Sequence, residues 1–327
     1  MLIKFPKPLV VVSQCLGFEA CRPDGELFRS QSVEKLSRWV DFIQVCPELS
    51  LGLGVPRDPM RVETHENGLR FMQQNTARDL TQDLEQFASG FLDDLPEVDG
   101  FIMKSRSPSC GLRDIAVYAG SVPVQAGTRA TSLLGELIAS RFPNLPREDE
   151  GRLTNYRLRE HFLAWLFAHA ELREARKVGT LHALIQFHAR HKYQLMACSP
   201  KRSKELGHIV ANHDQKDPAE VFSQYEEALG EAMKVAPRLA ANVNVLTHCM
   251  GYFSKELSGK EKRYFLETLE DYKERKVPIS VPVALLRSWI VRFGEPYLEG
   301  QSYFSPYPEE LASVVATDKR RKPRKKR

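Results

Sequence analysis

Three short β-rich runs, each ending in a break of Gly, Pro or Ser, most constrain what this chain can fold into. The runs are PLVVVSQCLG (8–17), VDFIQVCPEL (40–49) and VDGFIMKSRS (98–107). Helical patterns lie between and after them, at 32–40, at 76–96 with Thr76 as the expected N-cap, and at 131–143. Strands that alternate with helices predict an α/β fold built on a small parallel sheet.

From residue 153 onward the pattern is helical. The expected helices are 153–178, 181–198, 202–212, 217–250, 258–275 and 283–294. The Pro-rich, charged stretch FPNLPREDEGRL (142–153) is typical of a linker. The sequence therefore predicts an α/β amino-terminal domain (1–147), an all-α carboxy-terminal domain (153–312) and a disordered basic tail (318–327).

Charge is unevenly divided between the two halves. Residues 1–150 carry 16 Lys+Arg against 21 Asp+Glu, and residues 151–327 carry 31 against 21. Eight of the positive charges lie in DKRRKPRKKR (318–327), which has no apolar residue to bury. We expect this tail to be solvated or bound to a polyanion such as RNA, through Lys319, Arg320, Arg321 and Lys322.

The apolar runs are too short to span a membrane, and MLIKFPKP does not read as a signal peptide. Six scattered cysteines do not form a disulfide framework in a chain of this size. The sequence thus predicts a soluble, cytoplasmic protein without membrane association, in which each cysteine is a buried apolar residue, a nucleophile or a ligand.

Cys15, Cys46 and Cys110 each stand at or after the carboxyl end of a predicted strand. Because these ends meet at one edge of a parallel sheet, the three thiols are expected to converge. Three thiolates suit a [4Fe-4S] cluster in which one iron has no protein ligand. A zinc ion with an open coordination position is the second interpretation, and buried cysteines that only pack are the third. Glu48 lies two residues after Cys46, and Ser107 and Ser109 just precede Cys110, so an acid/base group and hydroxyl donors flank the thiols.

Three motifs carry a resemblance to a known family. SQCLGFEACRPDG (13–25), VCPELSLGLGVPRDP (45–59) and KSRSPSCG (104–111) resemble motifs of the thiouracil desulfidases, iron-sulfur enzymes that remove sulfur from thiopyrimidines. The second half, with LIQFHARHKYQLMACS, NVLTHCMGYFSKELS and QSYFSPYPEEL, is similar to the helical domain fused to that module in proteins assigned to 4-thiouridine removal from tRNA.

The resemblance implies roles for individual residues. Cys15, Cys46 and Cys110 would ligate a [4Fe-4S] cluster, Glu48 would act as acid/base, and Ser107 would assist at the substrate. The open iron would bind the thiocarbonyl sulfur as a Lewis acid, and water activated by Glu48 would replace that sulfur without net electron transfer. Candidates for substrate binding are Ser109, Lys104 and Asp24, with Arg106 beside Lys104.

One departure from the family pattern lies in CRPDG (21–25), where short members usually show Tyr-Asp-Gly. Cys21 is six residues from Cys15 and has three readings: a fourth ligand, a sulfur acceptor or a buried thiol. As a fourth ligand it would close the open iron and block the Lewis-acid mechanism.

The helical domain contains FHARHKYQ (187–194), which mixes aromatic and basic side chains. Such a mixture suits RNA, and we expect Arg190 and Lys192 to contact it. The alternative is packing, because Leu184, Phe187, His188 and His191 fall on one helical face. The histidines of this half match no metal-ligand spacing.

The leading hypothesis is therefore a desulfidase that converts 4-thiouridine in tRNA to uridine. A second enzyme hypothesis keeps the cluster but acts on free thiouracil or thionucleosides. The non-enzyme hypothesis is a metal-containing RNA-binding protein in which Glu48 and the serines only support the site.

Overall fold

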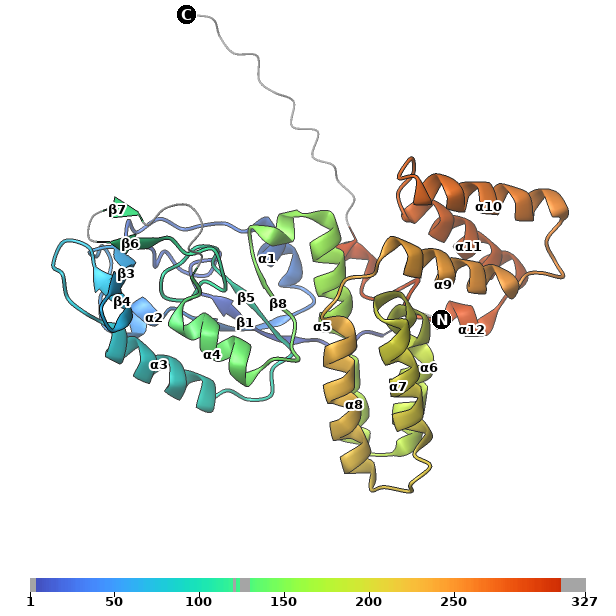
Figure 1. Ribbon diagram of the computed structural model, residues 1–327, viewed down its shortest axis with the longest axis horizontal. Helices are drawn as coiled ribbons and strands as arrows, with labels where there is room; N and C mark the ends of the chain where they lie inside the picture. The colour runs from blue at the N-terminus through green and yellow to red at the C-terminus, as the bar shows by residue number, and fades with distance from the viewer. Residues whose placement is uncertain (1–3, 120–121, 124–129, 313–327) are drawn as a thin grey trace, which may run out of the picture.

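A computed structural model of the protein describes residues 4–119, 122–123 and 130–312. Its α/β part and its helical part lie side by side along the longest axis (Figure 1). The fold class expected from the sequence is confirmed for these residues. The basic tail at 318–327 lies outside them.

The first sheet is parallel, with strand order β2-β1-β5-β8. Its strands are β1 (Leu9–Ser13), β2 (Asp41–Val45), β5 (Gly100–Met103) and β8 (Arg147–Asp149). Central strands of a parallel sheet are covered on both faces, which explains the unbroken apolar run Val10–Val12, fully buried here. The three predicted strands are confirmed, and the stretch predicted as a linker contributes the edge strand β8.

Helices α1 (Gln31–Leu36), α2 (Pro47–Ser50), α3 (Thr81–Asp93) and α4 (Leu133–Arg141) connect the strands of this part. Helix α3 begins at Thr81, four residues later than an N-cap at Thr76 would place it. Thr76 instead donates its backbone N–H to the Asp58 carboxylate, 3.0 Å away, and Asn75 donates to the same carboxylate at 2.9 Å. Thr76 therefore closes a loop and does not cap a helix.

A second sheet, with strand order β4-β3-β6-β7, was not predicted. It consists of β3 (Met60–His65), β4 (Gly68–Gln73), β6 (Val117–Ala119) and β7 (Val122–Pro123). β3 and β4 form a hairpin in which His65 pairs with Gly68. The two turn residues are Glu66 and Asn67, and Gly68, with a φ of 106°, is the first residue of β4. An Asn-Gly dipeptide is a hairpin signal, but the charged residues of both strands weaken the apolar alternation.

The helical part follows the prediction closely. It contains α5 (Tyr156–Val178), α6 (Leu181–Cys198), α7 (Pro200–Ala211), α8 (Pro218–Met233), α9 (Leu239–Gly251), α10 (Gly259–Lys273), α11 (Ser280–Phe293) and α12 (Pro296–Glu299), with 3₁₀ turns η1 (Arg152–Thr154) and η2 (Glu309–Leu311). The single helix expected over 217–250 is two helices. Pro237 separates α8 from α9, because proline lacks an N–H and disfavours helical backbone in the residue before it.

Helix α5 belongs to both parts. Phe162, Leu166 and Phe167 pack against Val10 and Ile102 of the sheet. On the other side of the helix, its Trp165 and Leu172 pack into the core formed with α6, α7 and α8. The two parts therefore share a helix, which explains why Figure 1 shows α5 standing between them.

Two further contacts tie the ends of the helical part to the α/β part. A Cβ on Gly230 of α8 would lie 2.3 Å from Cβ of Asn144, so only glycine allows this approach. Tyr307 and Leu311 pack into the same core as Val10 and Phe167. None of the described helices is long and apolar enough to cross a membrane.

Candidate active site

Four thiols line one cavity of about 310 Å³ at the carboxyl edge of the parallel sheet. Cys15 and Cys46 follow the ends of β1 and β2, and Cys110 lies in the loop after β5. The structure thus brings together the three cysteines that the sequence predicted would converge, and it adds Cys21. All four are free thiols.

The environment of these cysteines disfavours bare thiolates. Burial raises the pKa of Cys46 to about 12 and that of Cys110 to about 11, and burial together with the other three cysteines raises the pKa of Cys15 further. Burial also raises the pKa of Cys21, whose thiol hydrogen-bonds with that of Cys46. Because thiolates are the metal-binding form, a bound cation would be needed to ionise this set near neutral pH.

The loop KSRSPSCG has a backbone that explains its composition. Gly111 donates its N–H to the Ser107 carbonyl at 2.9 Å, and a Cβ at residue 111 would lie 2.6 Å from that oxygen. Ser13 of β1 accepts a hydrogen bond from the Lys104 backbone N–H at 2.8 Å, and its Oγ lies 3.3 Å from Cys110 Sγ. The loop is therefore folded over the end of the sheet with the Cys110 thiol turned inward.

The serines of this loop connect the thiol to a carboxylate. Ser107 Oγ lies 3.2 Å from Cys110 Sγ and 3.2 Å from Ser109 Oγ. Ser109, almost fully buried, donates to Glu48 Oε1 at 2.7 Å. Glu48 and both serines line the cavity with the thiols, as expected from their positions in the sequence.

Glu48 forms a buried ion pair with Arg57. Arg57 Nε donates to Glu48 Oε2 at 2.7 Å, and its other nitrogens donate to the carbonyls of Cys21 and Gly54. Both charged side chains are less than a tenth exposed. Arg57 was missed as a site residue; the available signal was its place in the second motif, VCPELSLGLGVPRDP.

Lys104 lines the cavity, but a second carboxylate holds its ammonium group. Lys104 Nζ lies 2.5 Å from Glu150 Oε1, and Glu150 also accepts from the Ser105 backbone N–H at 2.6 Å. The ammonium group is 4.6 Å from the centre of the Phe28 ring. Glu150 follows β8 directly and was not predicted; it positions the 104–107 segment of the loop.

Asp24 is not among the residues that line the cavity. Its carboxylate pairs with Arg22 at 3.0 Å and accepts from the Glu26 backbone N–H at 3.0 Å. Its neighbours Arg22 and Pro23 reach the cavity instead. A substrate contact by Asp24 remains a prediction.

The candidate RNA contacts of the helical part differ in exposure. Arg190 bonds to Glu171 at 2.8 Å and to the Gly300 carbonyl at 2.8 Å. His191 is buried between Glu171 and Ser302, each 2.9 Å from a ring nitrogen. Lys192 is exposed. Most of the FHARHKYQ face is therefore packed, whereas the RNA roles of Arg190 and Lys192 remain predictions.

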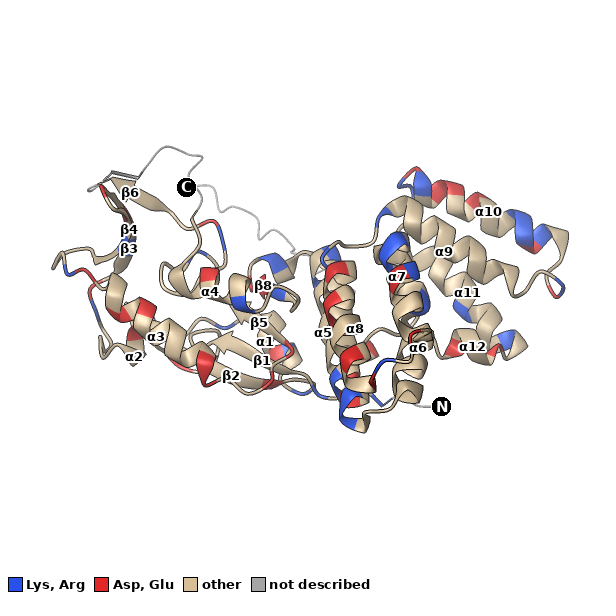
Figure 2. Cartoon of the chain, turned by 60° about the horizontal axis from the view of Figure 1, so that its bottom comes forward, with Lys and Arg blue, Asp and Glu red and all other residues tan. Residues whose placement is uncertain are grey.

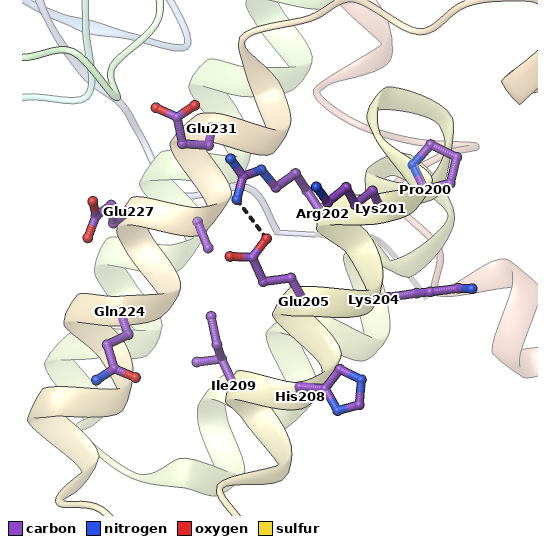
Figure 3. Close-up of a pocket in the computed structure, with 11 residues that line it drawn as sticks. Pro200, Lys201, Arg202, Lys204, Glu205, His208, Ile209, Gln224, Glu227 and Glu231 are labelled. Atoms are coloured by element: carbon purple, nitrogen blue, oxygen red, sulfur yellow. Dashed lines mark hydrogen bonds and ion pairs between the residues drawn. The ribbon is translucent and has the colours of Figure 1, made fainter.

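A wider groove of about 1130 Å³ lies between α7 and α8. Figure 2 shows Lys and Arg positions along the ribbon of α7, and Figure 3 shows Arg202 directed toward Glu205 between the helices. The Arg202–Glu205 pair at 2.7 Å neutralises the centre of this groove. No thiol lines it, so the cysteine cavity is the better candidate for an active site.

Among the described residues, no group of three or more His, Cys, Asp or Glu side chains closes around a single metal ion. The thiols are instead distributed around the wall of their common cavity. This fold and site define an α/β protein whose active site lies at the carboxyl edge of a parallel sheet.

Comparison with known proteins identifies the family. The family model described as 2-thiouracil desulfurase matches residues 10–150, and that described as a protein of unknown function (DUF1722) matches residues 192–308. The uncharacterized protein YbbK of Bacillus subtilis (strain 168) is 31% identical over 110 residues, which are 32% of this chain and 73% of that protein. The chain belongs to the 2-thiouracil desulfurase family and carries an additional DUF1722 domain.

Two further proteins are similar over part of the chain. The uncharacterized protein YbgA of Escherichia coli (strain K12) is 25% identical over 148 residues, which are 45% of this chain and 88% of that protein. The [4Fe-4S]-dependent thiouracil desulfidase TudS has a solved structure that is 23% identical, with a TM-score of 0.35, over 45% of this chain and 94% of the TudS chain. Family membership makes this protein a desulfidase.

Proposed function

We propose that this protein removes sulfur from 4-thiouridine in tRNA and leaves uridine, using an iron-sulfur cluster held by its amino-terminal domain. The observation that carries the proposal is the single cavity shared by four thiols, the Glu48 carboxylate and two serine hydroxyls. The reaction consumes water and releases sulfide, so it balances without an oxidant or a reductant.

The donor set fits a [4Fe-4S] cluster. Thiolates are the preferred ligands of iron-sulfur centres, and the irons of a cubane are separate, so thiols spread around a cavity wall can each bind a different one. Cys15, Cys46 and Cys110 would hold the cluster, as the resemblance implies. When bound, it would supply an unligated iron as a Lewis acid toward the thiocarbonyl sulfur.

The protein's own groups provide the proton chemistry. Glu48 Oε2 is held by Arg57 and Oε1 by Ser109, which fixes the carboxylate at the cavity wall. A fixed carboxylate can accept a proton from the attacking water and return it to the leaving sulfur. Ser107, between Cys110 and Ser109, is placed to orient the substrate ring by hydrogen bonding.

The tRNA substrate is supported by the second half of the chain. Residues 151–327 carry an excess of ten positive charges over negative ones, and Figure 2 marks Lys and Arg positions along the ribbon of α7. Such an excess suits a polyanion whose phosphates require neutralisation. A base within folded RNA would have to leave its stack to reach a cavity of this kind.

Free thiouracil is the second candidate substrate. The description of the family as 2-thiouracil desulfurases favours it. Free base and tRNA would use the same cavity, and only tRNA would need the helical domain.

The test gives the cluster-reconstituted protein equal amounts of thiolated tRNA and free 4-thiouracil. Nucleoside mass spectrometry follows 4-thiouridine, and absorbance follows the free base. We expect faster conversion of tRNA, with loss of both reactions in Cys110→Ala. Conversion of the free base alone would assign the second candidate, and conversion of neither with verified iron and sulfide would refute the desulfidase proposal.

A further inference from the structure

A second cavity, of about 250 Å³, lies where the α/β part meets the helical part. One side of it comes from the loop after Cys110 and from the edge strand β8, and the other side comes from α5 and α8. Figures 1 and 2 both show β8 beside α5. The cavity is separate from the thiol-lined cavity, with which it shares no lining residue.

Basic side chains dominate the charged lining of this cavity. Its charged lining consists of four basic side chains, Arg113, Arg147, Arg152 and Lys234, and one carboxylate, Glu148. Arg152 donates two hydrogen bonds to the Glu148 carboxylate, of 2.7 and 3.1 Å, and Arg113 lies 3.7 Å from the same carboxylate. Outside the lining, Asp149 lies 4.0 Å from Arg113, and Glu231 of α8 pairs with Lys234. Among the described residues, Arg147 is therefore the cation of this cavity that lacks a carboxylate partner, and its charge favours an anion there.

Arg147 is the least compensated of these cations. It is half-buried, and its donors among the described residues reach only the backbone carbonyls of Phe142, at 3.1 Å, and Pro143, at 3.5 Å. Within the described part of the chain it has no carboxylate partner. Burial and the charge of Arg113 lower its pKa, in keeping with a guanidinium that lacks a counterion.

Two buried polar atoms of α5 in this cavity also lack partners. The indole N–H of Trp165 donates to no described group, and Trp165 is 8% exposed. His161 uses Nε2 to donate to the Met233 carbonyl at 2.8 Å, so its Nδ1 carries a lone pair, and this atom is unpartnered as well. Buried polar groups are normally satisfied, so these two indicate a ligand with both an acceptor and a donor.

An RNA backbone offers this combination. Its phosphate can accept from guanidinium and indole N–H groups, and its 2′-hydroxyl can donate to an imidazole lone pair. We propose that the junction cavity binds one phosphate of an RNA backbone together with a neighbouring 2′-hydroxyl, through Arg147, Trp165 and His161. This site extends the RNA substrate proposed above, and its test measures binding separately from desulfuration.

The first experiment measures the affinity of the full-length, cluster-loaded protein for an unmodified tRNA transcript across a salt series. Arg147→Gln should weaken binding several-fold and make the slope of log K against log salt less steep by about 0.7 to 0.9, the value for one lost phosphate contact. Arg147→Lys keeps the charge and should keep the slope. Arg78→Gln, on an exposed arginine that does not line the cavity, is the matched control and should bind as the wild type does.

Trp165→Phe should change the affinity and the salt slope in a different way from Arg147→Gln. It keeps an aromatic ring in the core but removes a neutral donor, so affinity should fall while the salt slope stays unchanged. Circular dichroism and iron content confirm that each variant folds and carries its cluster. Wild-type affinity and slope in Arg147→Gln would overturn the proposal.

A second experiment distinguishes an RNA phosphate from a free phosphate or nucleotide as the ligand of this cavity. It measures the binding of inorganic phosphate and of uridine monophosphate by calorimetry. Under the proposal both bind weakly, Arg147→Gln removes the binding, and a DNA strand of the same sequence binds less tightly than the RNA. A phosphate or nucleotide that binds through Arg147, with tRNA affinity unaffected by Arg147→Gln, would make this a small-ligand site. That outcome would overturn the RNA assignment and leave the desulfidase proposal intact.

Discussion

The Glu48 carboxylate has two partners that fix both of its oxygens, and this arrangement makes its catalytic role testable apart from its structural one. Glu48→Gln keeps the shape of the side chain but cannot accept a proton. We expect desulfuration to fall about 10²- to 10⁴-fold, the range for loss of a general base, with iron and sulfide content unchanged. Rates are measured per intact cluster.

The same substitution leaves the Arg57 charge buried without its partner, so stability should also fall, by about 3 kcal/mol. Glu63→Gln provides the matched control. Glu63 is a buried carboxylate paired with Arg61 at 2.6 Å on β3, and it does not line the thiol cavity. It should lose stability without losing activity per cluster; equal losses of activity in both variants would show that Glu48 acts only through the fold.

The structure makes the three possible roles of Cys21 testable. Its thiol hydrogen-bonds to the thiol of Cys46, and its carbonyl accepts a hydrogen bond from Arg57 at 2.8 Å, so Cys21 supports two residues of the site. We expect Cys21→Ser to retain iron and sulfide, whereas Cys15→Ser loses them, because a hydroxyl is a poor ligand for an iron-sulfur centre. Cys198→Ser, on a buried thiol of the helical part, controls for loss of a core cysteine. Loss of iron from Cys21→Ser would identify a fourth ligand.

Sequence reasoning located the cysteines, Glu48 and the loop serines because each follows a strand with clear apolar character. It did not locate Arg57 or Glu150. These two act through ion pairs with residues 9 and 46 positions away, Glu48 and Lys104 respectively. Such pairings depend on how loops return to the sheet, and apolar periodicity does not report that; the sequence signal for Arg57 was its place in the second motif.

At the scale of elements, α5 is the main connection between the two parts, and a buried charge network fastens it to the sheet. His169 Nδ1 lies 3.2 Å from Asp99, which precedes β5, and its Nε2 lies 3.4 Å from Glu226 of α8. Asp99 is fully buried, pairs with Arg173 at 3.2 Å and also accepts from the Leu9 backbone N–H at 2.8 Å. The network thus joins β1, α5 and α8.

This network predicts a pH-dependent contribution to stability. Burial alone would lower the pKa of His169, but Asp99 and Glu226 outweigh it and raise the pKa above its ordinary value of 6.5. A raised folded-state pKa gives stabilisation that is fully present below pH 6.5 and is lost as the pH rises through the folded pKa. The melting temperature of the wild type relative to His169→Gln should therefore be highest at acidic pH and should decline toward alkaline pH.

The comparison with His169→Gln is needed because burial lowers the pKa of His161. The contribution of His161 to stability therefore changes with pH in the opposite direction to that of His169. His182→Gln, on an exposed histidine of α6, should follow the wild-type pH profile. A difference between wild type and His169→Gln that stays constant with pH would show that His169 contributes by packing alone.

Elements were predictable where apolar periodicity was strong. Three of the four parallel strands lie within the predicted runs, because those runs are strongly apolar, and α6 has its predicted bounds. The second sheet was missed because its strands carry charged residues within a partly exposed hairpin. The break at Pro237 was overlooked because apolar residues continue at helical spacing on both sides of it.

At the scale of the whole molecule, the chain returns to the α/β part before its basic tail. Tyr307 and Leu311 pack into the core that contains Val10 and Phe167. The last described residue, Ala312, also packs there, six residues before the basic stretch begins at residue 318. The described part of the chain therefore ends beside the sheet.

This position gives the tail a testable part in substrate capture. Residues 318–327 carry eight of the chain's Lys and Arg residues, and such a segment supplies affinity for phosphates without sequence information. Deleting these ten residues should weaken tRNA binding and flatten its salt dependence. The rate with free 4-thiouracil should stay the same, because a small neutral base needs no phosphate contacts. Full tRNA affinity across the salt series in the truncated protein would contradict this role and leave the junction cavity as the better candidate for phosphate contact.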